Sequence, residues 1–122
     1  MSDVLMVAGI AVAGGLGAGL RFLLDTALTT RLRSRFPWGI AVVNLSGSFA
    51  LGLLTGASLG EPLASVLAVG LLGGYTTFST ASVDTVRLFL TRRPGAALVN
   101  GFGVLVAGVA LAVLGILTTA PA

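Results

Sequence analysis

The chain has 122 residues, of which 56% are hydrophobic and 9% are charged, and its mean hydropathy is +1.07. Because a soluble domain carries about 25% charged residues, this composition argues against a water-soluble domain and indicates a membrane protein. The sequence contains no cysteine and no histidine, which excludes disulfides, imidazole catalysis and the common transition-metal sites. We therefore expect no enzyme, since no nucleophile–base pair or metal cluster can be assembled from these residues.

Four apolar segments follow one another, each about as long as the 20 residues that a helix needs to cross a bilayer. We predict an all-α membrane protein with a single four-helix transmembrane domain over residues 1–122, its spans at about 4–28, 38–60, 63–90 and 95–118. No Lys or Arg precedes Arg21, so the first segment lacks the positive start of a signal peptide and is predicted to be a retained span. Arg21 lies within this span, where it either reaches back to the interface or lines a vestibule.

The second span carries Asn44 in its first third, at the start of the run NLSGSF. A polar group at membrane depth is costly unless it is paired or functional. Two roles therefore remain open for the amide: a hydrogen bond between helices, or a polar position along a transport path.

The third span contains the run GGYTTFST, which begins at Gly73 and is followed by Ser82 and Asp84. Adjacent glycines and adjacent threonines are poor helix formers, and residues 63–90 are long for one straight crossing. We predict a break near Gly73–Thr77, which a membrane tolerates only where the backbone is buried in protein or lines a wet cavity. Carbonyls freed there could bind a cation. The alternative is a continuous helix whose hydroxyls bond back to their own carbonyls.

The fourth span carries Asn100 near its start, and glycines recur through all the spans. Pairs of glycines four residues apart place two small residues on one helix face, where helices pack closely. The pairs are Gly15 and Gly19, Gly52 and Gly56, and Gly70 and Gly74.

The arginines gather at the end of the bundle that holds the first and third connectors, residues 30–37 and 91–94. They are Arg21, Arg31, Arg33, Arg35, Arg87, Arg92 and Arg93. The opposite end, with the connector 60–62, has only the acids Asp3 and Glu61. The positive-inside rule places the basic connectors in the cytoplasm and both termini outside. It also explains the net charge of +3, so we expect no nucleic-acid partner.

Three motifs together resemble the Fluc (CrcB) fluoride channel family. The run GGLGAGLRF from Gly14 to Phe22 is similar to the family's GGxxGAxxR pattern followed by an aromatic residue. The run WGIAVVNLSGSF from Trp38 is similar to its GTLxVNxxGSF motif, and GGYTTFST to its GGxTTFST signature. The motifs occur in the family's order and cover nearly the whole chain.

The resemblance implies a fluoride-selective passive channel that exports fluoride through the plasma (inner) membrane of a prokaryote. It also implies a dual-topology antiparallel dimer, surrounded by membrane lipid, with two pores and a central structural sodium ion (Na+). The carbonyls of Gly73 and Thr76 would hold the sodium. The pore would be lined by Asn44, Phe78, Ser79 and Thr80, with Arg21 at its mouth. Fluoride holds water tightly, and amide N–H groups, hydroxyls and the positive edge of an aromatic ring can replace that water.

The sequence departs from the family pattern at three positions. Ala81 stands where the family has a second phenylalanine, Asn100 where it has a tyrosine, and Asp84 where it usually has a glutamate. A chain that inserts in both orientations also needs nearly equal numbers of arginines on its two sides, whereas the arginines of this chain all favour one side. We therefore expect one subunit of a heterodimer whose partner is a paralogue of opposite orientation; a self-paired antiparallel dimer is the alternative.

Two other classes compete with a channel. A small multidrug-type antiporter needs a membrane-embedded carboxylate in its first span, and here no acid lies between Asp3 and Asp25. Asp84 and Arg87, three residues apart, are expected to pair on the helix surface. A purely structural membrane protein would leave the polar clusters at Asn44 and at Thr76–Thr80 unexplained.

Overall fold

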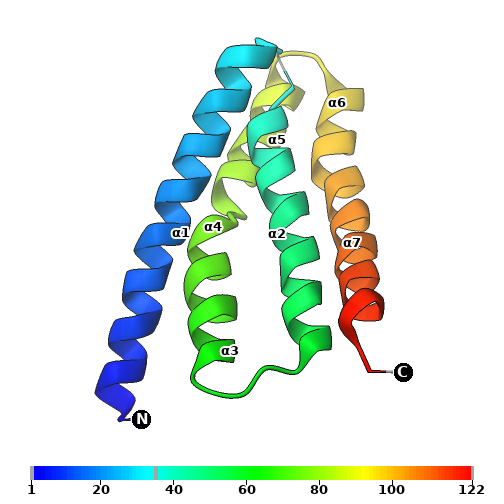
Figure 1. Ribbon diagram of the computed structural model, residues 1–122. Helices are drawn as coiled ribbons and strands as arrows, with labels where there is room; N and C mark the ends of the chain where they lie inside the picture. The colour runs from blue at the N-terminus through cyan, green and yellow to red at the C-terminus, as the bar shows by residue number, and fades with distance from the viewer. Residues whose placement is uncertain (1, 35, 122) are drawn as a thin grey trace.

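The computed structural model describes residues 2–34 and 36–121, and the regular structure in these ranges is entirely helical. The long helical rods lie side by side, with the two termini at the same end (Figure 1). Each rod is long and apolar enough to cross a membrane: Asp3–Leu32, Trp38–Ala57, Leu63–Leu90 and Pro94–Thr119. The predicted all-α fold with four spans is confirmed at this level.

The first helix, α1 (Asp3–Leu32), is longer than the predicted span, which was expected to end near residue 28. It begins where the Ser2 hydroxyl accepts a hydrogen bond from the N–H of Leu5, a typical N-cap. It ends at Arg33, which adopts the left-handed conformation with φ of 47°. The first connector is accordingly shorter than residues 30–37.

The second helix, α2 (Trp38–Ala57), ends before the predicted residue 60 because Ser58 also turns left-handed, with φ of 54°. The second connector therefore starts at Ser58 rather than at Gly60. The first turn of α2 packs against the side chain and backbone of Asp25 on α1, where only a glycine, Gly39, leaves room.

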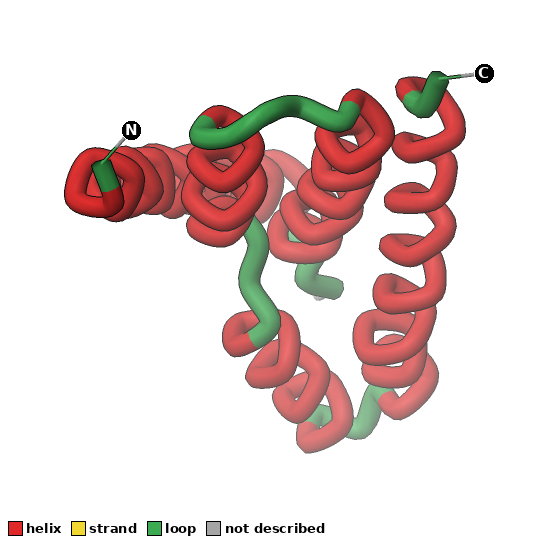
Figure 2. The backbone as a smooth tube through the Cα atoms, turned by 90° about the horizontal axis from the view of Figure 1, so that it is seen from below, coloured by secondary structure: helices red, strands yellow, loops and turns green. Residues whose placement is uncertain are grey.

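The third rod is a chain of shorter helices. It consists of α3 (Leu63–Ser65), the π-helix η1 (Val66–Leu72), α4 (Gly73–Tyr75) and α5 (Ser79–Leu90). Seen from below in Figure 2, a non-helical stretch leads to α5, which does not continue the line of the preceding half. The non-helical residues 76–78 overlap the predicted break near Gly73–Thr77 only at its end, because both glycines and Tyr75 are still helical.

The fourth rod is interrupted only by a change of helix type. It consists of α6 (Pro94–Leu98), the π-helix η2 (Val99–Gly103) and α7 (Val104–Thr119). Pro94 takes the first helical position, where its missing N–H costs nothing. Short π-helical segments often mark functional positions, and η2 carries Asn100.

Glycines bring two pairs of helices into backbone contact. A methyl group on Gly17 of α1 would collide with the carbonyl of Leu71, and one on Gly74 with the carbonyl of Gly14. Gly52 and Gly56 of α2 lie in the same way against α7, where a methyl group would collide with the carbonyls of Ala112 and Ile116. These contacts confirm the predicted close packing at Gly52, Gly56 and Gly74. A methyl group on Gly15 or Gly19 would meet no described residue outside its own helix within 4 Å.

The surface of the bundle is apolar, and few hydrophobic side chains are buried inside it. Buried hydrophobic side chains are few: Ala13, Ile40, Ala41, Val43, Leu88 and Ala97. Large apolar side chains on all four rods lie exposed, the reverse of a water-soluble domain. These surfaces suit lipid or another subunit, in keeping with a multi-pass membrane protein.

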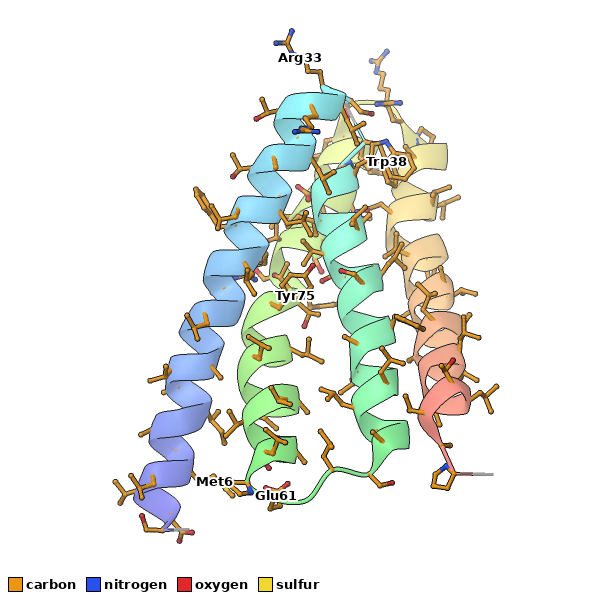
Figure 3. All side chains as sticks on the ribbon, in the orientation of Figure 1. Met6, Arg33, Trp38, Glu61 and Tyr75 are labelled. Carbon is orange, nitrogen blue, oxygen red and sulfur yellow. The ribbon has the colours of Figure 1, made fainter. Side chains whose placement is uncertain are left out.

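The two ends of the bundle differ in charge. Figure 3 shows Arg33 and Trp38 at one end and Glu61 and Met6 at the other. The connectors that carry the arginines share the first end in Figure 1. Arg35, also assigned to this end, lies outside the described residues.

Candidate functional site

The centre of the candidate site is the break in the third span. Helix α4 ends at Tyr75, and Thr76 is extended, with φ of −84° and ψ of 159°. Helix α5 then begins at Ser79, one residue after Phe78, which already has helical angles. The glycine and threonine composition of this segment explains why a helix gives way here rather than elsewhere.

The amide of Asn44 replaces the missing helical hydrogen bonds. Its Oδ1 accepts from the N–H of Thr77 at 2.9 Å, and its Nδ2 donates to the carbonyl of the same residue at 2.8 Å. Asn44 therefore forms the interhelical bond that was one of its two predicted roles. Since a primary amide has two N–H groups, one donor of Asn44 is left over for another partner.

The break frees carbonyls of the third span, among them those of Gly73 and Thr76. A continuous helix would pair the carbonyl of Gly73 with the N–H of Thr77, and the carbonyl of Thr76 with the N–H of Thr80. The N–H of Thr77 goes to Asn44 instead, and that of Thr80 goes to the Thr77 hydroxyl at 3.2 Å. Among the described residues, no backbone N–H bonds to either carbonyl.

Arg21 reaches one of these freed carbonyls. Its Nη1 donates to the Thr76 carbonyl at 3.4 Å, a long hydrogen bond between α1 and the break. In this chain the guanidinium thus bonds to the protein interior instead of extending only to the membrane interface. Whether it lines a pore mouth stays a prediction.

Phe78 and Asn44 line two adjoining clefts. One, of about 400 Å³, lies between α2 and the break and is also lined by Gly73 and Thr76. The other, of about 320 Å³, extends between α2, α5 and the fourth rod and reaches Asn100. The Phe78 side chain is 87% exposed in this single chain, so its ring is open to whatever lies in these clefts or beside the subunit.

The predicted pore residues do not all share one surface. Thr80 lines a third cleft, of about 680 Å³, together with Asp25, Asp84 and Arg87. This cleft lies toward the arginine-rich end, because it also includes residues of the first connector. Ser79 is exposed and lines none of these three clefts. In the single chain, then, Asn44 and Phe78 are brought together and the two hydroxyl residues are not.

The sequence marks Asn100 as a polar residue in an apolar span and as a departure from the family pattern, and the structure shows its partners. It is 5% exposed and is the one buried polar side chain among the described residues. Its Nδ2 donates to the Thr85 hydroxyl at 2.9 Å and lies 3.3 Å from the Ala81 carbonyl. The Thr85 hydroxyl donates to that carbonyl as well, at 2.9 Å. This cluster ties η2 to α5 one turn beyond Phe78, and its sequence signal was a lone amide in an apolar span.

The expected pair of Asp84 and Arg87 is present at the limit of an ion pair. The Asp84 Oδ1 and Arg87 Nη1 atoms are 4.0 Å apart, with the arginine side chain largely exposed. Such a pair contributes little to stability. In the described residues no group of three or more His, Cys, Asp or Glu side chains could hold a metal ion.

Comparison with known proteins connects this geometry to a family. The family described as CrcB-like protein, Camphor Resistance (CrcB), matches residues 8–116. A protein of Leifsonia xyli subsp. xyli named fluoride-specific ion channel FluC 1 is 45% identical over 116 residues, covering 92% of this chain and 85% of that protein. A fluoride-specific ion channel FluC 2 of Cutibacterium acnes is 44% identical over 114 residues, covering 88% and 91%. Both alignments include the break in the third span and the Asn44 region, and the chain therefore belongs to the CrcB-like protein family.

Proposed function

We propose that this chain is a subunit of a fluoride-specific channel that lets fluoride leave the cytoplasm passively through the inner membrane of a bacterium. Family membership and the names of the relatives support this function. The observation that carries it is the break in the third span, where Asn44 bonds to Thr77 beside an exposed Phe78.

The groups around the break suit a small, strongly hydrated anion. One N–H of the Asn44 amide has no partner among the described residues, and Ser79 and Thr80 are exposed residues with hydroxyl groups. The exposed ring of Phe78 offers its positive edge. These donors together replace the water of fluoride. Because they are uncharged, they do not bind the ion too tightly for its release.

The conducting unit is an antiparallel dimer. The donors are spread over separate surfaces of one chain, and Phe78 lies open, so a second subunit is needed to enclose a path. The described arginines of both basic connectors lie at one end of the bundle, which favours a single orientation. We therefore infer that the second subunit is a paralogue of opposite orientation.

A sodium ion fits the freed carbonyls of the third span. The carbonyls of Gly73 and Thr76 have lost their helical partners, and Gly73 is exposed. Carbonyl oxygens are suitable ligands for a hard cation. A sodium ion held there would fix the broken segments of two subunits relative to each other.

Fluoride efflux from liposomes tests the function. One preparation holds this chain alone and a second holds it with a paralogue from the same genome. We expect fluoride efflux, with no chloride efflux, when the partner is present. Efflux from the chain alone would contradict the heterodimer but support the channel function. No efflux from either preparation would contradict the channel function.

The position of Asp25 argues against the multidrug-type antiporter. Asp25 is the one acid in the first span beyond its first turn, and its carboxylate accepts from the Thr29 hydroxyl and packs on the start of α2. A carboxylate held in this way has a structural role at the end of the span.

A further inference from the structure

Arg21 is a charged side chain within a membrane span, and no carboxylate of the described residues forms an ion pair with it. Among the described residues, the one arginine within 4.0 Å of a carboxylate is Arg87. The hydrogen bond of Arg21 goes to the Thr76 carbonyl, 3.4 Å away. Arginine stays protonated in proteins, so this bond brings a permanent positive charge to the break.

The same carbonyl belongs to the sodium site proposed above, on which this inference rests. A carbonyl oxygen has two lone pairs and can accept a guanidinium N–H and a cation together. The two positive charges would then lie only a few ångströms apart. At an effective dielectric constant of about 20, like charges at that distance repel by several times RT. The guanidinium and the sodium ion therefore compete at Thr76.

We propose that Arg21 is a tethered cation of the third-span break. It holds the Thr76 carbonyl when no ion is bound, and its charge weakens sodium binding when an ion is present. Arg21 is thus a positioning residue that sets the cation affinity of the site, in addition to any effect on anions.

The length of the hydrogen bond agrees with this role. At 3.4 Å the Arg21–Thr76 bond is longer than a typical charge-assisted bond of about 2.7–2.9 Å. A loosely held guanidinium can move aside as an ion enters, whereas a short bidentate bond would block the carbonyl. Arg21 is also only partly buried, which leaves its side chain room to move.

Sodium-dependent stability of the purified dimer tests the proposal without measuring transport. Thermal unfolding is followed in detergent over a series of sodium concentrations, with N-methyl-D-glucamine as the replacing cation. An ion that binds only the folded state raises the unfolding temperature according to its dissociation constant. The variants are Arg21→Gln and Arg21→Met, which remove the charge, and Arg21→Lys, which keeps it.

The matched control is Arg31→Gln, the same charge removal on the same helix. Arg31 lies exposed in the last turn of α1, away from the break. We expect the apparent sodium dissociation constant to fall about tenfold in Arg21→Gln, the equivalent of about 1.4 kcal/mol. Arg21→Lys and Arg31→Gln should remain within about threefold of the unaltered protein. Arg21→Met serves as the neutral variant if the glutamine variant does not fold.

The outcomes separate this inference from the proposals on which it rests. If sodium stabilises every variant equally, or Arg21→Gln binds it more weakly, the competition is refuted and the sodium site stands. If sodium stabilises none of them, both the site and the competition are refuted. Neither result bears on fluoride transport, which the liposome assay measures separately.

Discussion

At the scale of single residues, two asparagines hold the third span in place from either side. Asn44 pairs with both backbone groups of Thr77, and Asn100 donates to the Thr85 hydroxyl and the Ala81 carbonyl. Their neighbours in the spans are mostly apolar, so each amide would be costly without these bonds. Both contacts lie next to the clefts that Phe78 lines.

Replacing Asn44 by leucine should destabilise the protein strongly. The N–H and carbonyl of Thr77 would lose their partners inside the protein, at a cost of about 1–3 kcal/mol for each unsatisfied group. The free energy of unfolding and fluoride efflux should both fall. Ser48→Ala is the control for stability, because the Ser48 hydroxyl bonds only to the Asn44 carbonyl of its own helix. Equal unfolding free energies for the two variants would contradict the role of Asn44.

Asn100 and Thr85 should show coupled effects on stability. Asn100→Leu leaves the Thr85 hydroxyl with its bond to Ala81, whereas Thr85→Val leaves the amide with one weaker contact. A double-mutant cycle on the unfolding free energy should give a coupling of about 0.6 kcal/mol, with an upper value near 1.7 kcal/mol. Strict additivity of the two changes would show that the hydrogen bond contributes nothing.

At the scale of helices, glycine positions determine which rods approach one another. Helix α1 meets α4 through Gly17 and Gly74, and α2 meets α7 through Gly52 and Gly56. Between apolar helices in lipid, close packing is a main source of association. The spacing of glycines alone cannot identify the contacting face, as Gly15 and Gly19 demonstrate.

Alanine substitution in α1 should separate contacting from open positions. Gly17→Ala would push the new methyl group into the Leu71 carbonyl and the Tyr75 N–H, at a cost of about 1–3 kcal/mol. Gly15→Ala is the matched control, because its methyl group would meet no described residue outside its own helix within 4 Å. It should be neutral or stabilising by helix propensity. Chemical denaturation in detergent measures both. Destabilisation by Gly15→Ala, seen only in the dimer, would reveal that this face contacts the second subunit.

At the scale of the whole molecule, the distribution of charge predicts a single orientation. The described connector arginines lie at one end, and Glu61 lies at the other. A cation near a span end is retained on the cytoplasmic side. The gathering of arginines at one end, more than any feature of the pore, argues for a partner of opposite orientation.

Cysteine labelling should reveal this orientation, because the chain has no cysteine of its own. Ser58→Cys, in the connector between α2 and α3, should react with an impermeant maleimide on intact spheroplasts. Ser34→Cys, in the connector between α1 and α2, should react only after the membrane is permeabilised. Both serines are exposed, so a difference in labelling would report the side of the membrane and not burial within the protein. Labelling of both variants from outside would show dual topology and support the self-paired dimer.

The sequence by itself determined the number of spans, their order, the charged end and the region of the break. These properties are local: the length of an apolar run, the position of arginines and the weak helix propensity of GGYTTFST can be read without knowing any contact. The family could be inferred for the same reason, since its motifs are continuous runs. Helix ends were less accurate, because the left-handed turns at Arg33 and Ser58 have no glycine to mark them.

Only the tertiary structure decided which atoms meet. That Asn44 bonds to the backbone of Thr77, that Arg21 reaches Thr76, and that Thr80 faces a different cleft from Phe78 all depend on how each rod is rotated about its axis. Rotation is set by close contacts such as that of Gly17 with Leu71, between residues far apart in the chain. On nearly uniformly apolar helices the sequence pattern carries little information about rotation, so the packing of backbones has to supply it.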